Sequence, residues 1–233
     1  MRLNIVKITR LLAQRYLDFD HYNKKNPLNE LIFVLFSVMK SEPVYTRTYR
    51  NFKKSFPRYT DILNASIQDI AKSIYHGGQS MQKATAIQSI TSILAERFGR
   101  PTLAPLKNML DNECEVFLTS LPRVGKKVAR CVMLYSLGRK VFPIDIHCRR
   151  IAIRLGWINA TKFNEDALQD MIPEELRFSL HVNLISLGRE FCTARSPVCR
   201  LCPLTGICRK IGVAQDCIPN TSKPKVSRIC ATT

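Results

Sequence analysis

Long apolar runs are absent from this 233-residue chain. The longest aliphatic and aromatic run covers residues 31–36, far fewer than the roughly 20 residues that a membrane-spanning helix needs. The N-terminal residues, MRLNIVKITR, contain no apolar core of the kind found in a secretory signal. We therefore expect no membrane association and an intracellular, non-secreted protein. In that setting its nine cysteines are reduced thiols or metal ligands and not disulfides.

Acidic residues are scarce as well. Against 36 Lys and Arg stand only 18 Asp and Glu, which gives a formal net charge of +18. Such an excess indicates a polyanionic partner, and nucleic acid is the first candidate. The imbalance is greatest in residues 121–154, where nine Lys or Arg accompany one acidic residue, Asp145. Because a solvated surface normally mixes both signs, this segment is either a basic docking face or a place where a lysine and Asp145 act together.

Strand signals are missing too, since neither a sustained apolar–polar alternation nor an Asn-Gly hairpin turn occurs. Apolar residues recur instead at helical spacing, between start and stop signals such as Asn26-Pro27, Ser66 and Gly99. These patterns predict an all-α protein with short connections. Residues 1–20 predict an amphipathic helix, and we favour a packing role for it over that of a nucleic-acid-binding arm.

Four cysteines lie within residues 192–208, CTARSPVCRLCPLTGIC, at the spacing Cys-x6-Cys-x2-Cys-x5-Cys. Four thiolates in so short a loop can bind one metal centre, and both zinc and an iron–sulfur cluster accept such a set. Zinc sites usually carry two Cys-x2-Cys pairs, and the single pair here favours iron–sulfur. Two further cysteines, Cys217 and Cys230, have no obvious partners. The candidate ligands are Cys192, Cys199, Cys202 and Cys208.

Three motifs, in this order, resemble those of the helix–hairpin–helix DNA glycosylases, in particular the endonuclease III branch. Residues 121–129, LPRVGKKVA, are similar to that family's hairpin pattern Leu-Pro-Gly-Val-Gly-x-Lys-x-Ala. Residues 142–156, FPIDIHCRRIAIRLG, are similar to its Val-Asp-Thr-His segment, and the cysteine loop resembles its [4Fe–4S] loop. The resemblance is strongest over residues 118–210 and extends in part to the plant demethylase glycosylases.

The resemblance implies two helical lobes with a DNA-binding cleft between them. Residues 26–138 would form a helical barrel module that ends in the helix–hairpin–helix. Residues 1–25 and 139–211 would form the lobe of the [4Fe–4S] cluster, with zinc as the alternative metal. Residues 212–233 are rich in Pro, Ser, Thr and Lys and predict a loosely ordered tail. The implied partner is double-stranded DNA, and we expect a monomer.

Matched residue by residue, the resemblance makes Lys127 the catalytic lysine, Asp145 the catalytic aspartate and His147 the histidine that follows it. In the family the lysine attacks C1′ of a flipped nucleotide, and the resulting Schiff base permits β-elimination of the 3′ phosphate. An amine must be neutral to attack, and partial burial among other cations favours that form. The aspartate can move protons and stabilise positive charge at C1′. Without the resemblance, Lys127 reads as a solvated phosphate contact and Asp145 as a helix N-cap.

The hairpin has a second expected role, because backbone N–H groups at a helix N-terminus bind a phosphate. Two residues depart from the family pattern. Arg123 replaces the first hairpin glycine, so it either strains the turn or adds a phosphate contact. Met39 falls near the position where the family often has a glutamine that fills the gap left by the flipped base. An apolar wedge would thus replace a polar side chain that reads the opposite strand. The expected DNA contacts are Met39, Leu121, Arg123, Val124, Gly125, Lys126, His147 and Arg200.

The sequence thus predicts a base-excision repair enzyme, a bifunctional DNA N-glycosylase and abasic-site lyase that removes oxidised pyrimidines. Two alternatives stay open: a glycosylase for mismatched or methylated pyrimidines, and a non-catalytic, metal-stabilised DNA-binding protein. Lys127 argues against the non-catalytic alternative, because binding alone would tolerate an arginine there. The same lysine argues against a monofunctional adenine-type glycosylase, whose branch lacks it.

Overall fold

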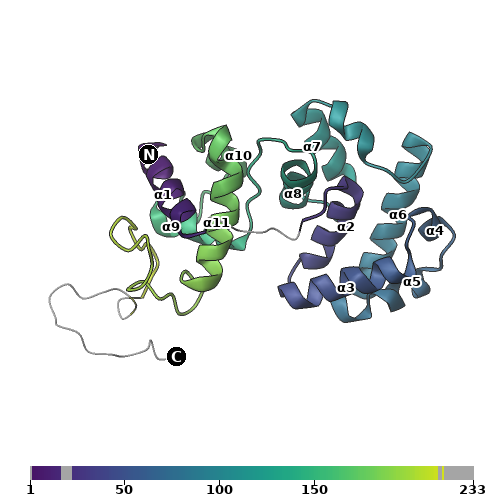
Figure 1. Ribbon diagram of the computed structural model, residues 1–233, viewed down its shortest axis with the longest axis horizontal. Helices are drawn as coiled ribbons and strands as arrows, with labels where there is room; N and C mark the ends of the chain where they lie inside the picture. The colour runs from purple at the N-terminus through teal and green to yellow at the C-terminus, as the bar shows by residue number, and fades with distance from the viewer. Residues whose placement is uncertain (1, 17–22, 215–216, 218–233) are drawn as a thin grey trace. The chain divides into compact units, whose positions relative to one another are not determined.

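The structure is a computed structural model that describes residues 2–16, 23–214 and 217, and all regular elements in these ranges are helices (Figure 1). The predicted all-α class is therefore confirmed for this part of the chain. The chain divides into two compact units, Tyr22–Arg139 and a second one formed by Met1–His21 with Lys140–Thr233. The described helices include none with the length and apolar character needed to cross a membrane. The tail predicted for residues 212–233 lies mostly outside the described residues.

The helices are short and follow one another closely along the chain. Those of the unit Tyr22–Arg139 are α2 (Pro27–Ser37), α3 (Glu42–Ser55), α4 (Thr60–Leu63), α5 (Ile67–Ser73), η1 (Tyr75–Gly77), α6 (Ser80–Phe98), η2 (Ala104–Asn108), α7 (Asp111–Ser120) and α8 (Lys126–Ser136). Those of the other unit are α1 (Arg2–Arg15), α9 (Ile146–Leu155), α10 (Glu165–Met171), η3 (Glu174–Leu176) and α11 (Arg177–Glu190).

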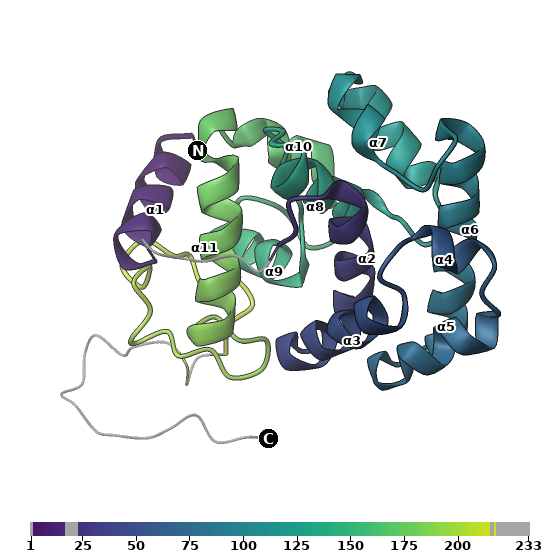
Figure 2. The same ribbon diagram turned by 45° about the vertical axis from the view of Figure 1, so that its right-hand side comes forward.

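Helix α2 forms the centre of the unit Tyr22–Arg139. It is apolar nearly all round, and most of its side chains are buried, as expected for a core helix. It packs against α3 and α8, and both views show α3 alongside it (Figures 1 and 2). Edge-to-face ring pairs tie α2 to α3, with centroid distances of 5.2 Å for Phe33–Tyr45 and 5.5 Å for Phe36–Phe52. The packing of α2 against α8 fixes the helix that begins with the two hairpin lysines.

The predicted helix boundaries have the expected capping contacts. Asn26 accepts hydrogen bonds from the N–H groups of Leu28 and Asn29, each at 3.0 Å, and Pro27 opens α2. At α5, the Ser66 hydroxyl accepts from the Asp69 N–H at 3.1 Å. Three orphan N–H groups at helix starts are thereby satisfied.

In the other unit, α1 and α9 both pack against α11, and α1 lies beside α11 in both views (Figures 1 and 2). Ile5, Ile8 and Leu12 of α1 are fully buried in the same core as Leu180 and Leu184 of α11. The expected packing role of the N-terminal helix is confirmed for its described residues. This core also supports α9, at whose N-terminus Asp145 lies.

The Asn26 cap gives a first prediction. Asn26→Ala removes the acceptor of two N–H groups, so the free energy of unfolding should fall by about 1 kcal/mol. Urea unfolding of the two proteins measures the difference. Asn112→Ala, at an exposed position inside α7, is the control and should cause little or no loss, because alanine is the better helix former. Equal losses in both variants would contradict a capping role for Asn26.

Candidate active site

The hairpin between α7 and α8 provides no side-chain cap for the first turn of α8. The Val124 N–H donates to the Leu121 carbonyl at 3.1 Å and closes the turn. Gly125 is the N-cap residue of α8, and it supplies no side-chain acceptor for the first N–H groups of that helix. The N–H groups at the positive end of a helix dipole favour an anion such as a phosphate. Leu121 and Val124 are only 2% and 4% exposed, so they can offer a ligand little beyond their backbone.

Arg123 occupies the hairpin position where the family pattern has its first glycine. Its φ is +61°, so the turn requires the left-handed conformation here and an arginine adopts it. For a residue with a Cβ atom this conformation costs roughly 1–2 kcal/mol. The exposed side chain donates a hydrogen bond from Nη2 to the Gln79 Oε1 atom at 2.7 Å. Of the two readings of Arg123, the backbone strain is present in the structure, while the phosphate contact stays a prediction.

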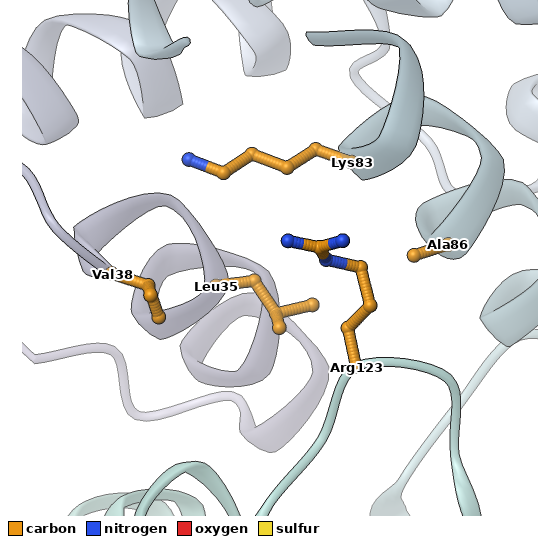
Figure 3. Close-up of a pocket in the computed structure, with 5 residues that line it drawn as sticks. All are labelled: Leu35, Val38, Lys83, Ala86 and Arg123. Carbon is orange, nitrogen blue, oxygen red and sulfur yellow. The ribbon is translucent and has the colours of Figure 1, made fainter. Parts of the chain in front are cut away.

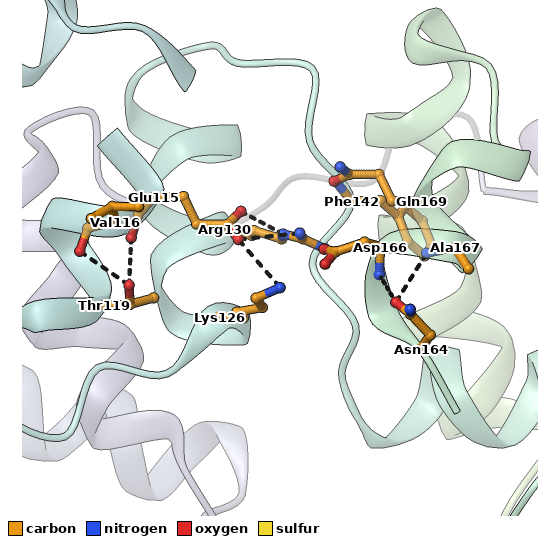
Figure 4. A network of polar contacts seen from close by, with 10 residues as sticks. All are labelled: Glu115, Val116, Thr119, Lys126, Arg130, Phe142, Asn164, Asp166, Ala167 and Gln169. Atoms are coloured by element: carbon orange, nitrogen blue, oxygen red, sulfur yellow. Dashed lines mark hydrogen bonds and ion pairs between the residues drawn. The ribbon is translucent and has the colours of Figure 1, made fainter. Parts of the chain in front are cut away.

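The two hairpin lysines have different surroundings. Lys126 is exposed, and its Nζ atom lies 3.9 Å from Oε1 of Glu115 on α7. The same carboxylate binds the buried guanidinium of Arg130 at 2.7 and 3.2 Å, and Figure 4 shows both cations directed to Glu115. Lys127 is half-buried, and its charge acts on Glu30 of α2. The first lysine thus belongs to the α7 side of α8, and the second belongs to the α2 side.

Glu30 is a carboxylate in the interior of the unit. It is fully buried, and it accepts hydrogen bonds from the Lys24 N–H at 2.6 Å and from the Asn23 Nδ2 atom. Burial raises the pKa of Glu30 to about 7, although these two hydrogen bonds and the charges of Lys24 and Lys127 oppose the shift. Near neutral pH, the charge beside Lys127 therefore depends on pH.

Asp145 belongs to the other unit and caps α9. Its Oδ1 atom accepts a hydrogen bond from the Cys148 N–H at 2.8 Å, as the capping interpretation predicts. The Cys148 thiol lies 3.5 Å from Nδ1 of the buried His181. Burial alone would raise the pKa of Asp145, but the charges of His181 and His147 and the capping bond hold it below its ordinary value. Asp145 is therefore ionised at neutral pH.

His147 is half-buried beneath α11 and not a free surface group. Its Nδ1 atom lies 3.0 Å from Nη2 of Arg150. A Cβ atom on Gly188 would lie 2.5 Å from that same nitrogen, so α11 approaches this ring closely because it has a glycine there. Burial lowers the pKa of His147, and Arg150 and Arg189 lower it further, although the charge of Asp145 opposes the shift. Its predicted DNA contact stays a prediction.

Two other expected DNA contacts lie on exposed loops. Met39, with φ of +57°, is 87% exposed just after the end of α2. A methionine so exposed is available as an apolar wedge. Arg200 is exposed within the cysteine loop. Lys127 and Asp145 belong to different units, so the pairing of these two side chains stays a prediction.

The cysteine loop is tied to α9 by Arg154, which is buried. Its guanidinium donates to the Cys192 Sγ atom at 3.1 Å and to the carbonyls of Thr193 and Ala194 at 2.7 and 2.9 Å. The Lys210 N–H donates to the Cys208 Sγ atom at 3.4 Å. The Cys192 and Cys208 sulfurs thus accept N–H hydrogen bonds, and Cys202 accepts one from the Leu204 backbone.

The donor set fits a thiolate-bound metal centre in its chemistry. All four thiols are half-buried, and burial raises the pKa of Cys202 to about 11 and also raises those of Cys199 and Cys208. A bound metal would therefore displace protons from these thiols. Within the described ranges, no three Cys, His, Asp or Glu side chains lie close enough together to hold a metal ion. The cluster ligands accordingly stay a prediction.

Four residues of these networks were not anticipated from the sequence as parts of the site: Glu30, Gln79, Glu115 and Arg154. Glu30 carried a usable signal, because it is the only charged residue of α2, a helix whose other residues are mostly apolar. Glu115 and Arg154 are charged residues at ordinary helical positions. Their roles appear only once the partners from other helices are known.

Comparison with known proteins identifies the family. The fold and the hairpin define a helix–hairpin–helix protein, and the description "HhH-GPD superfamily base excision DNA repair protein" matches residues 38–174, more than half of the chain. The chain belongs to this superfamily and, within it, to the endonuclease III-like branch. The resemblance inferred from the three motifs is confirmed.

The relatives include proteins of plants and bacteria. A protein of Arabidopsis thaliana named as a DNA glycosylase is 30% identical over 195 residues, which cover 78% of this chain and 67% of the relative. Endonuclease III of Thermotoga maritima is 28% identical over 209 residues and covers 88% and 92% of the two chains. The Arabidopsis DNA glycosylase/AP lyase ROS1 is 28% identical over 183 residues, but these are only 13% of its length.

Solved structures share the fold. A trapped covalent intermediate of endonuclease III with DNA has a TM-score of 0.79 at 24% identity and covers 90% of this chain and 96% of that one. A non-covalent endonuclease III–DNA complex reaches 0.80 with the same identity and coverage. At this identity the likeness establishes the helical fold.

Glu30 gives a prediction on pH dependence. Its folded-state pKa, about 7, lies above the ordinary value of 4.5, so the folded protein loses stability as pH rises between these values. The loss due to this group should amount to about 3 kcal/mol. Glu30→Gln cannot ionise, so its stability relative to the wild type should rise over this pH window. Urea unfolding between about pH 5 and pH 8 measures the difference.

The exposed carboxylate of Glu96 on α6 provides the matched control. Glu96→Gln should show the wild-type dependence of stability on pH. An identical dependence in Glu30→Gln and the wild type would contradict the account of the buried carboxylate. The test is how the free energy of unfolding changes with pH, and not its absolute value. The glutamine amide of Glu30→Gln also changes the hydrogen bonds to Asn23 and Lys24, and it does so at every pH.

Proposed function

We propose that this chain is a bifunctional DNA glycosylase and abasic-site lyase that removes oxidised pyrimidines from double-stranded DNA, with Lys127 as the nucleophile. One observation carries the proposal. Lys127 lies half-buried in the first turn of α8, a helix that follows the hairpin and has no side-chain cap bond at its N-cap residue, Gly125. A phosphate bound at this helix end would bring the sugar of the same strand close to the lysine. The family to which the chain belongs supports the reaction class.

The position of Lys127 suits it to be a nucleophile better than that of Lys126. An amine attacks only as the free base, and partial burial disfavours its charged form. Lys126 is exposed and lies beside the Glu115 carboxylate, so its side chain is placed at the surface for electrostatic contact. The two adjacent residues therefore provide one cation for electrostatic contact and one amine for chemistry.

The proposed reaction begins when the lone pair of Lys127 Nζ forms a bond to C1′ of the flipped nucleotide. The bond between C1′ and the base breaks, and its electron pair leaves with the base, which takes up a proton. Loss of a proton from the amine and opening of the sugar ring give a Schiff base. Removal of a C2′ proton then expels the 3′ phosphate by β-elimination. Water then hydrolyses the Schiff base, which frees the Lys127 amine and releases the nicked strand with an unsaturated aldehyde at its 3′ end.

Asp145 is proposed to stabilise the charge that develops at C1′ as the base departs. Its pKa is held below the ordinary value, so it is a carboxylate throughout the neutral range. A fixed negative charge near C1′ favours the oxocarbenium-like transition state. The cap bond to the Cys148 N–H fixes the carboxylate at the start of α9.

We also propose that Cys192, Cys199, Cys202 and Cys208 hold a [4Fe–4S] cluster. The half-buried thiols and the N–H donors of Arg154 and Lys210 support this assignment. When bound, such a cluster would fix the loop that carries Arg200 and add no chemistry to base removal. Zinc bound by the same four thiolates is the alternative.

The nucleophile is tested by borohydride trapping on a duplex with one abasic site. The wild type and Lys126→Ala should form a covalent adduct, because both retain the Lys127 amine. Lys127→Ala should form none above background. Gel mobility measures the adduct, and binding to an uncleavable abasic analogue shows whether each variant still binds DNA. A wild type that binds the duplex tightly without forming an adduct would contradict the lyase.

The metal is tested by analysis of the purified protein. Cys202→Ser should lose most of its iron and sulfide, along with the visible absorption of an iron–sulfur cluster. Cys114→Ala, a buried free thiol of α7, should retain all three signals. Iron-free protein with one stoichiometric zinc would show the alternative metal, and no metal in protein purified without air would contradict both assignments.

A further inference from the structure

A cavity of about 260 Å³ lies inside the unit Tyr22–Arg139, beside the hairpin. Three apolar residues and two cations line it: Leu35, Val38, Ala86, Lys83 and Arg123. Figure 3 shows the Lys83 and Arg123 side chains extending into the same space, with Leu35 and Val38 beneath them. An apolar floor under two cationic heads suits a flat ring with an electron-rich edge.

The backbone around this cavity is strained. Of the four non-glycine residues with positive φ in the described part of the chain, three lie here. Met39 follows the lining residue Val38, Gln79 accepts the Arg123 hydrogen bond, and Arg123 itself forms a wall. Strain of this kind persists where the surrounding structure enforces it, and it concentrates at ligand sites.

The polar groups that the lining side chains present are all hydrogen-bond donors. Arg123 uses one N–H on Gln79, and Lys83 Nζ donates to the Gly77 carbonyl at 3.1 Å, so both heads keep further N–H groups. Lys40 adds charge, since its Nζ atom lies 2.6 Å from where a Gly78 Cβ would be. Burial lowers the pKa of Lys83, and Lys40 and Arg123 lower it further. A ligand edge with two adjacent acceptors matches this set, and an edge carrying an amino group does not.

We propose that this cavity binds the guanine opposite the excised base, and that Arg123 is the residue that recognises it. The inference rests on the proposed function and narrows it, because a lesion opposite guanine derives from cytosine. Guanine is the base that offers O6 and N7 together to an arginine, whereas adenine offers N7 beside an amino donor.

The position of the cavity distinguishes the opposite base from the lesion. Met39, next to the lining residue Val38, is 87% exposed, and apolar side chains of this kind wedge between bases. Once the lesion has flipped out, the base opposite it has lost its pairing partner and lies next to Met39. The flipped lesion must instead reach Lys127, which is not among the lining residues.

The test is the affinity of the full chain for four duplexes, each with an uncleavable tetrahydrofuran abasic analogue opposite G, A, C or T. The wild type should bind the guanine duplex about tenfold more tightly than the adenine duplex. Arg123→Gly suits the positive φ, and Arg123→Lys keeps the charge. In both variants the ratio of the two affinities should fall close to one. Arg100→Gly, an exposed change of the same charge, should preserve it.

Two results would overturn the inference. One is a wild type that does not discriminate among the four duplexes. The other is an Arg123→Gly protein that binds all four more weakly by one factor and with a shallower salt dependence, which would identify a phosphate contact. Borohydride trapping of the same wild-type preparation separates the two proposals. An adduct without discrimination removes only the guanine site, whereas a protein with neither adduct nor abasic-site binding removes the proposed function as well.

Discussion

Consecutive residues of an α-helix point about 100° apart, and this constraint separates the two lysines at the start of α8. Lys126 lies beside Glu115, whose carboxylate also holds the buried Arg130. Lys127 lies on the side of α8 that faces α2, where its positive charge lowers the pKa of Glu30. The hairpin register therefore decides which amine is exposed and which is half-buried. The proposed chemistry depends on that register more than on the total positive charge of the segment.

The buried carboxylate of Glu30 links this helix start to the rest of its unit. It binds the Lys24 N–H and the Asn23 side chain, and the Ser136 hydroxyl at the other end of α8 donates to the Lys24 carbonyl at 2.5 Å. The segment of Asn23 and Lys24 thus binds the Glu30 carboxylate of α2 and the Ser136 hydroxyl of α8. A buried carboxylate with a pKa near 7 costs stability at neutral pH, and such groups concentrate at functional sites.

Local rules predicted much of the fold, since the all-α class, the caps at Asn26 and Asp145 and the family follow from signals within a few residues of one another. Contacts between distant segments were not predictable in this way. The bond from Arg123 to Gln79 spans 44 residues, and that from Arg154 to Cys192 spans 38. Periodicity gives each helix an apolar face but does not say which faces meet. The pairing of Lys127 with Asp145 and the metal ligands stay predictions for the same reason.

The Lys127 nitrogen is proposed to form the bond to DNA, and peptide mapping of the borohydride-reduced wild-type adduct identifies the amine that forms it. Proteolysis and tandem mass spectrometry locate the sugar remnant without any substitution in the site. We expect the remnant on Lys127 and an unmodified Lys126. A remnant on Lys126, or on an amine outside α8, would contradict the proposal.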